Sequence, residues 1–248
     1  MEAARRSTTL DATVATGARQ ESVDVEISDL RANPPRQFRM TGRVQNVFPL
    51  PASQGGGIQL VRAFPSKGSL KTEENLHFGE RVSIFLDWAM LRLQTARAGA
   101  DLAPVRPTLL VKGSETPWQA GLTGWDEALL DASAGRRSDM LDDLHSRVAQ
   151  LVYWWHDAQR APHWYFARTS WKAASLPGNE VLTTAELATI QGAWSAYGGG
   201  GEKFFAPGFN RLVAGDVEFD RNPPQLTALV EFAEELLKTI SLSGLAHA

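Results

Sequence analysis

Arg39-Met-Thr-Gly-Arg-Val-Gln-Asn-Val-Phe48 and Ile58-Gln-Leu-Val-Arg-Ala-Phe64 decide the fold, because each has the β-branched and apolar residues typical of a strand. Pro49, Pro51 and Gly55-Gly-Gly57 lie between them, so we expect a long, adaptable hairpin loop rather than a two-residue turn. Neither segment contains a carboxylate. A cation such as Mg²⁺ needs charged oxygen ligands, so the hairpin offers no metal site of its own.

Apolar periodicity on either side of the hairpin predicts the rest of a sheet. Val23-Asp-Val-Glu-Ile27 alternates apolar and polar residues, which indicates a half-buried strand. From Val82 to Ala96 the apolar residues recur at helical spacing, so we expect a helix that packs on the sheet. Val105 to Lys112 predicts another long strand. This order favours an α/β or α+β fold around a small mixed sheet flanked by helices.

The second half of the chain predicts mainly helices. Residues 113–137 are rich in Gly, Ser and Ala, and we expect them to form a surface insertion. Thr183-Thr-Ala-Glu186 has the pattern of a capping box. The expected elements are a helix from near Asp139 to Pro162, a short aromatic strand at His163–Phe166, a helix from the capping box to Gly198, and a last helix from Asn222-Pro223 to Ile240.

Length and composition indicate one principal domain over residues 21–248, preceded by a flexible arm over residues 1–20. The 248 residues carry a net charge of −3, so any contact with DNA has to come from a local basic patch. Cysteine is absent, which excludes disulfides and thiolate chemistry. No apolar run approaches the length of a membrane span, and we expect a cytoplasmic protein without membrane contact.

Motifs for catalysis and cofactor binding are weak. Gly198-Gly-Gly-Gly201 lacks the Gly-Lys-Ser/Thr sequence of a phosphate loop, and a flexible helix stop is the simpler interpretation. No histidine pair has the spacing of a zinc hydrolase. Ser170 and Ser175 lack a Gly-x-Ser-x-Gly context. We therefore predict no catalytic residue, no metal and no cofactor.

Two groups of basic residues are candidates for DNA contact. Arg62, Lys67 and Lys71 lie at the exit of the hairpin, and Arg136-Arg137 lie in the expected insertion. Both groups suit phosphate contacts. Ordinary surface charge is the alternative for each group.

Acidic residues near the hairpin leave a second possibility open. Asp24 and Glu26 share the polar face of the first predicted strand, and Asp87 lies on the helix after the hairpin. These carboxylates could bind a cation if they pointed inward and converged. A solvated strand face is the alternative for Asp24 and Glu26.

Tryptophan is abundant, with eight residues, and two aromatic clusters lie close together in the chain. Trp154 and Trp155 are consecutive, so they cannot point to the same side of a helix. Trp155 continues the apolar stripe of Leu144 and Val148, and we therefore expect Trp154 to point away from the core. Trp154 and Trp164 are the candidates for anchoring a partner protein, and a thick local core is the alternative.

The hairpin and helix resemble the core of metal-dependent nucleases built as strand, turn, strand and helix. In those enzymes the first strand supplies an Asp after a Gly, and the second supplies an acid and a Lys two residues apart. The corresponding positions here are Gln45 and Val61-Arg62-Ala63. The chain therefore resembles a restriction-endonuclease-like core of the PD-(D/E)XK type with a degenerate active site.

Taken in order, several segments are similar to the C-terminal, nuclease-like domain of the RecC family, the gamma subunit of exodeoxyribonuclease V. The match spans roughly residues 22–242. The segments are Met40-Thr-Gly-Arg-Val-Gln45, Val82–Leu93, Leu144–Phe166, Ala193-Trp-Ser-Ala-Tyr-Gly-Gly-Gly-Gly-Glu202 and Pro207-Gly-Phe-Asn-Arg-Leu212.

This resemblance implies a non-catalytic scaffold and DNA-guiding domain in double-strand-break processing and recombinational repair. The implied partners are a RecB-type nuclease-helicase, a RecD-type helicase and DNA, with cleavage and ATP hydrolysis belonging to the partners. The family's two helicase-like domains have no counterpart in 248 residues, so we expect an isolated domain, a truncated product or a split subunit. The alternatives are an active metal-dependent nuclease with relocated acids, or a protein-interaction module that does not touch DNA.

Overall fold

The computed structural model describes residues 19–64, 76–97, 102–111, 114–117, 121–161, 163–176, 182–196, 201–205, 219 and 223–242. The chain divides into two compact units. The first unit consists of Met1–Leu76, Val82–Leu151 and Ser241–Ala248, and the second of His77–Arg81 and Val152–Ile240. Most of the expected N-terminal arm lies outside the described residues, but its last two residues, Arg19 and Gln20, already belong to the first strand.

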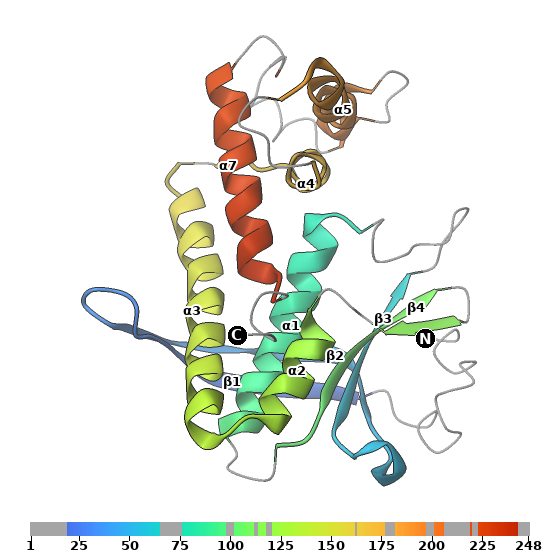
Figure 1. The fold of residues 1–248 in the computed structure, drawn as a ribbon, viewed down its shortest axis with the longest axis vertical. Coiled ribbons are helices and arrows are strands. Elements are labelled where there is room, and N and C mark those ends of the chain that lie inside the picture. The colour runs from blue at the N-terminus through green and yellow to red at the C-terminus, as the bar shows by residue number, and fades with distance from the viewer. Residues whose placement is uncertain are drawn as a thin grey trace. The chain divides into compact units, whose positions relative to one another are not determined.

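The first unit contains a five-stranded mixed sheet with the order β1-β2-β3-β4-β5. Neighbouring strands are antiparallel except for β3 and β4, which are parallel because a helix lies between them in the chain. Figure 1 shows helices packed beside these strands. The four predicted strands are confirmed, and β5 is an addition. The bounds are β1 Arg19–Asp29, β2 Arg36–Pro49, β3 Ile58–Phe64, β4 Val105–Val111 and β5 Ser114–Pro117.

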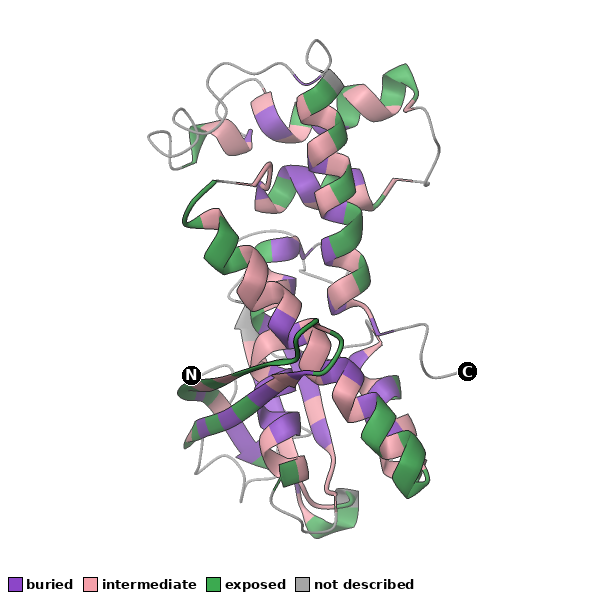
Figure 2. Ribbon diagram, turned by 90° about the vertical axis from the view of Figure 1, so that its left-hand side faces the viewer, coloured by how far each residue is buried: buried purple, intermediate pink, exposed green. Residues whose placement is uncertain are grey.

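Alternation along β1 explains why this edge strand forms. Val23, Val25 and Ile27 are buried, whereas Asp24 and Glu26 between them are exposed. Figure 2 shows the same alternation of buried and exposed residues along the strand. Because side chains of a strand point to opposite faces in turn, one face enters the core and the other meets water. The polar face predicted for Asp24 and Glu26 is therefore confirmed as a solvated one.

Gly57 fixes the end of the hairpin loop, which includes the short 3-10 helix η2 (Ala52–Gln54). Its φ angle is 94°, in the left-handed region that favours glycine. A Cβ atom there would lie 2.3 Å from the carbonyl oxygen of Pro104. The next residue, Ile58, donates its amide to that same oxygen at 2.9 Å. The glycine thus allows β3 to start directly beside the residue that precedes β4.

Three helices contribute to the first unit: α1 (Phe78–Arg97), α2 (Leu122–Asp131) and α3 (Ala134–Ala158). The predicted surface insertion over residues 113–137 is wrong, since the segment holds β5, α2 and the start of α3. Trp125 of α2 is fully buried and packs edge-on against Trp88 of α1, with ring centroids 5.3 Å apart. Small residues concealed the apolar spacing of Leu122, Trp125 and Leu129.

The second unit contains α4 (Ala167–Ala174), α5 (Thr184–Ser195), the short 3-10 helix η5 (Glu202–Phe204) and α7 (Pro223–Ile240). The predicted capping box is confirmed, because the Thr183 hydroxyl accepts from the Glu186 amide and the Glu186 carboxylate accepts from the Thr183 amide. The last predicted helix is also confirmed. The predicted strand at His163–Phe166 is wrong: this segment is irregular and leads into α4.

Aromatic rings form the core of the second unit. Trp194 of α5 is fully buried against Phe166, with ring centroids 4.4 Å apart, and against Phe219 at 5.7 Å. Large rings bury much apolar area per residue, which suits a small unit with short helices. The aromatic segment before α4 therefore supplies core side chains without forming a strand.

Candidate functional site

The positions that hold metal ligands in the nucleases resembled by this chain are not assembled into a site here. Gln45 is exposed, whereas Val61 is buried. Gln45 lies in a β-bulge, since β2 takes three residue steps from Val44 to Val47 where the paired β1 takes two. Asn46 within the bulge has a φ angle of 57°, and pairing of β2 with β3 ends at Val47. The two strands thus place these side chains in different environments.

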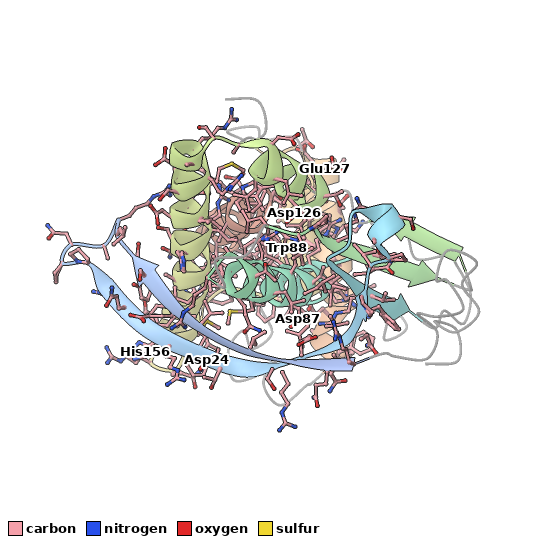
Figure 3. All side chains as sticks on the ribbon, turned by 90° about the horizontal axis from the view of Figure 1, so that it is seen from below. Asp24, Asp87, Trp88, Asp126, Glu127 and His156 are labelled. Atoms are coloured by element: carbon pink, nitrogen blue, oxygen red, sulfur yellow. The ribbon has the colours of Figure 1, made fainter. Side chains whose placement is uncertain are left out.

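Arg62 of β3 is the charged group of this region, and it points toward α1. Its guanidinium donates to the carboxylate of Asp87 and, at 3.2 Å, to the hydroxyl of Ser83 one turn earlier. Burial lowers the pKa of the Arg62 guanidinium, and the adjacent carboxylate balances its charge. In Figure 3, Asp87 lies on the opposite side of α1 from Trp88. A carboxylate held by an arginine is poorly placed to bind a divalent cation, because the arginine repels the ion and occupies its ligand.

The other acids considered as metal ligands do not join Asp87. Asp24 of β1 forms a bidentate pair with Arg39 of the neighbouring strand β2 on their exposed face. The distance from Nε of Arg39 to Oδ1 of Asp24 is 2.6 Å. The hydrogen bond from Arg39 lowers the pKa of the Asp24 carboxyl. Figure 3 shows Asp24 well apart from Asp87. Within the described ranges, no group of three or more His, Cys, Asp or Glu side chains could hold a metal ion.

The predicted DNA-contact residues have unequal surroundings. Arg62 is engaged with Asp87, as described above. Arg137 donates to the carbonyl oxygens of the last turn of α2, at 3.1 Å for Ala132, which makes it a C-terminal cap of that helix. Arg136 is exposed at the start of α3. Lys67 and Lys71 lie outside the described residues.

The orientation predicted for the two neighbouring tryptophans is wrong. Trp154 is partly buried and packs edge-on against Phe232 of α7, with ring centroids 5.1 Å apart. Trp155 is 66% exposed. Phe232 packs on a face of α3 that lies outside the apolar stripe of Leu144 and Val148. The stripe alone therefore does not predict which of the two rings is buried. Trp164 is partly buried against Phe219, at a centroid distance of 6.3 Å.

A buried ion pair between α1 and α2 was not predicted from the sequence. Arg92 of α1 donates to Asp126 of α2 at 2.9 Å, and both side chains are almost fully buried. The second oxygen of Asp126 accepts from the amide of Val105 at the start of β4. Burial raises the pKa of the Asp126 carboxyl, and the charge of Arg92 opposes that rise. The pair connects two helices to one strand. No local sequence pattern marks either residue as a member of an ion pair.

Glu202 caps a helix from a distance in the chain. Its carboxylate accepts from the amide of Arg168 at 3.1 Å and from the amide and hydroxyl of Thr169 at 2.8 and 2.9 Å, which satisfies the N-terminus of α4. A Cβ atom on Gly201 would lie 2.5 Å from the carbonyl oxygen of Trp194. Within the tetraglycine, Gly201 is thus required for close packing, and the other three glycines lie outside the described residues.

Comparisons with protein-family models, with curated proteins and with solved structures gave no match for this chain. The fold itself is a mixed α/β arrangement in which helices flank a mixed sheet. None of the described helices combines the length and the apolar character needed to cross a lipid bilayer.

Proposed function

We propose that this chain is a catalytically inert, nuclease-like domain that serves as scaffold and DNA guide in a RecC-type subunit of exodeoxyribonuclease V. The observation that carries the proposal is that the Asp87 carboxylate, on the helix beside β3, is held in an ion pair by Arg62. It combines with Gln45 and Val61 at the positions of the catalytic acids. A site of this composition lacks the hard, charged oxygens that two-metal or one-metal hydrolysis needs.

The order of elements supports a restriction-endonuclease-like core. A hairpin, β2 with β3, is followed by α1 and then by β4, which is parallel to β3 and directly beside it. This is the strand, turn, strand and helix arrangement on which the resemblance rests. In the proposed assembly the core has kept its architecture as a rigid support, while cleavage belongs to a RecB-type partner in the cytoplasm.

Trp155 supports the scaffold part of the proposal. A large indole that is 66% exposed is costly to leave in water and is a typical anchor in a protein interface. We assign it, in place of Trp154, as the anchor for the RecB-type nuclease-helicase, with a RecD-type helicase completing the complex. The same exposed ring is the observation that favours the second candidate, an interaction module that does not touch DNA.

The alternative of an active nuclease with relocated acids is the weaker one. It requires acids among Asp24, Glu26 and Asp87 to converge, yet Asp24 and Glu26 lie on the exposed face of β1 and Asp87 lies on α1. Asp24 and Asp87 are also each engaged by an arginine, Arg39 and Arg62, which competes with a cation for their oxygens.

A cleavage assay tests the inert site. The full chain is incubated with linear duplex and with single-stranded DNA in Mg²⁺ and in Mn²⁺, and we expect no degradation above a buffer control. Asp87→Ala and Asp24→Ala serve as matched variants. Degradation by the wild-type chain that disappears in either variant would show that the acids are catalytic and would overturn the proposal.

A further inference from the structure

Two exposed phenylalanines lie side by side on the second unit. Phe204 ends η5 and Phe205 follows it, and their exposed fractions are 49% and 50%. Exposed large apolar residues are ordinary when they are scattered, but here two exposed rings follow one another in the chain and each has a cation over it.

Two cations lie over these rings, and a third lies on the same side of α4 as one of them. The guanidinium carbon of Arg168 lies 4.7 Å from the centre of the Phe205 ring, and the ammonium of Lys203 lies 5.3 Å from the centre of the Phe204 ring. Lys172 follows Arg168 by one turn of α4, so both point to the same side of that helix, and both are exposed. In the part of the chain that the structure describes, none of the three cations forms an ion pair with a carboxylate.

Hydrogen bonds hold η5 against the start of α4. Glu202 immediately precedes Lys203 and is held by the first amides of α4, so η5 is tied to the helix that carries Arg168 and Lys172. The negative charge of Glu202 is turned toward those amides and the Thr169 hydroxyl. The carboxylate therefore interacts mainly with the positive end of the α4 dipole, and it offsets little of the positive charge of Arg168, Lys172 and Lys203.

We propose that this surface, defined by Arg168, Lys172, Lys203, Phe204 and Phe205, binds single-stranded nucleic acid. Unpaired bases stack on aromatic rings, and the phosphates between them are attracted by lysine and arginine. In a duplex the faces of the bases are already stacked on one another, so the rings have no access to them. The inference rests on the proposed function and deepens it, because it assigns the guided strand to particular residues.

The test measures fluorescence anisotropy of a labelled oligothymidylate of about 15 nucleotides, a length within the usual site size, at about 50 mM salt. The variants are Phe204→Leu with Phe205→Leu, which keeps apolar area without the rings, and Lys172→Gln with Lys203→Gln. Matched controls are Leu30→Ala and Arg160→Gln, an exposed large apolar residue and an exposed arginine outside the surface. Thermal melts establish that every variant is folded.

We expect the double leucine variant to bind the single strand about tenfold more weakly, while its slope against salt stays that of the wild type. The double glutamine variant, which removes two cations, should show a salt slope smaller by about 1.4. The two controls should bind like the wild type. An unlabelled duplex of the same length should compete poorly, because its bases are not free to stack.

Failure takes a recognisable form. Undiminished binding by a folded double leucine variant, or no binding by the wild-type chain at low salt, would overturn the proposal. Loss of partner binding in the double leucine variant with unchanged oligonucleotide binding would make the surface a protein interface, which also overturns it. Neither result touches the inert site at Arg62, which the cleavage assay tests separately.

Discussion

At the scale of single residues, Arg92 and Asp126 illustrate how a buried charge is made tolerable. Each is almost fully removed from water, and together they make hydrogen bonds to each other, to the carbonyl oxygen of Ala103 and to the amide of Val105. Desolvation of two ions costs several kcal/mol, and good geometry is needed to offset it. The pair therefore acts chiefly by dictating where α2 meets β4.

Removal of one partner should destabilise the chain strongly. We expect Asp126→Ala to lower the free energy of unfolding by about 3 to 5 kcal/mol, because Arg92 would be left buried and unpaired. The double variant Arg92→Met with Asp126→Leu should recover most of this loss. Urea denaturation measures both effects.

Glu127 is the matched control for this experiment. It follows Asp126 in α2 but is exposed, and Figure 3 shows the two side chains pointing apart. Glu127→Ala should change stability by no more than about 0.5 kcal/mol. Equal losses for Asp126→Ala and Glu127→Ala would contradict the assigned role of the pair.

At the scale of elements, α4 is a helix that depends on another part of the chain. Its eight residues are too few for a stable isolated helix, and its N-cap residue, Phe166, provides no side-chain oxygen. The Glu202 carboxylate takes over the capping of its N-terminus. The packed glycine before it, Gly201, sets where that carboxylate can stand.

The cap predicts a measurable loss when Glu202 is truncated. Glu202→Ala should cost about 2 kcal/mol of stability, because a charged hydrogen bond and the helix-dipole interaction disappear together. Hydrogen exchange should report faster opening of the α4 amides than of those in α7. Glu234→Ala, an exposed change on α7, is the control, and a similar effect from both variants would rule out the capping role.

At the scale of the whole molecule, function is proposed to lie in contacts with other chains. Asp24 and Asp87 are each paired with an arginine, while the Trp155 indole remains open to solvent. Energy in protein interfaces is concentrated in such aromatic anchors. The unit that carries Trp155 should therefore contribute binding energy to the proposed assembly.

The two neighbouring tryptophans should behave differently when truncated. Trp155→Ala should leave the melting temperature almost unchanged but weaken binding to the RecB-type subunit by about 2 kcal/mol or more. Trp154→Ala should lower the melting temperature, because its ring packs on Phe232. Thermal melts and a pull-down with the partner compare them. A Trp155→Ala variant that binds normally would remove Trp155 from the interface.

Much of the fold could be predicted because its signals are local. Alternation predicted β1, helical spacing predicted α1 and α7, and the capping box between Thr183 and Glu186 marked the start of α5. Each of these signals involves residues that are close together in the sequence. The missing acids at Gln45 and Val61 were also evident from the sequence, since their absence is a matter of residue type.

Local patterns predicted β1 to β4 and most of the helices, and residue type alone showed that the hairpin strands lack carboxylates. Only the tertiary structure decided that Trp155 is the exposed indole, that Arg92 meets Asp126 across 34 residues, and that Glu202 caps a helix 33 residues away. The physical reason is that periodicity and capping act between neighbours in the chain. Burial and charge pairing depend on which elements pack together, and no stretch of sequence states its own packing partner.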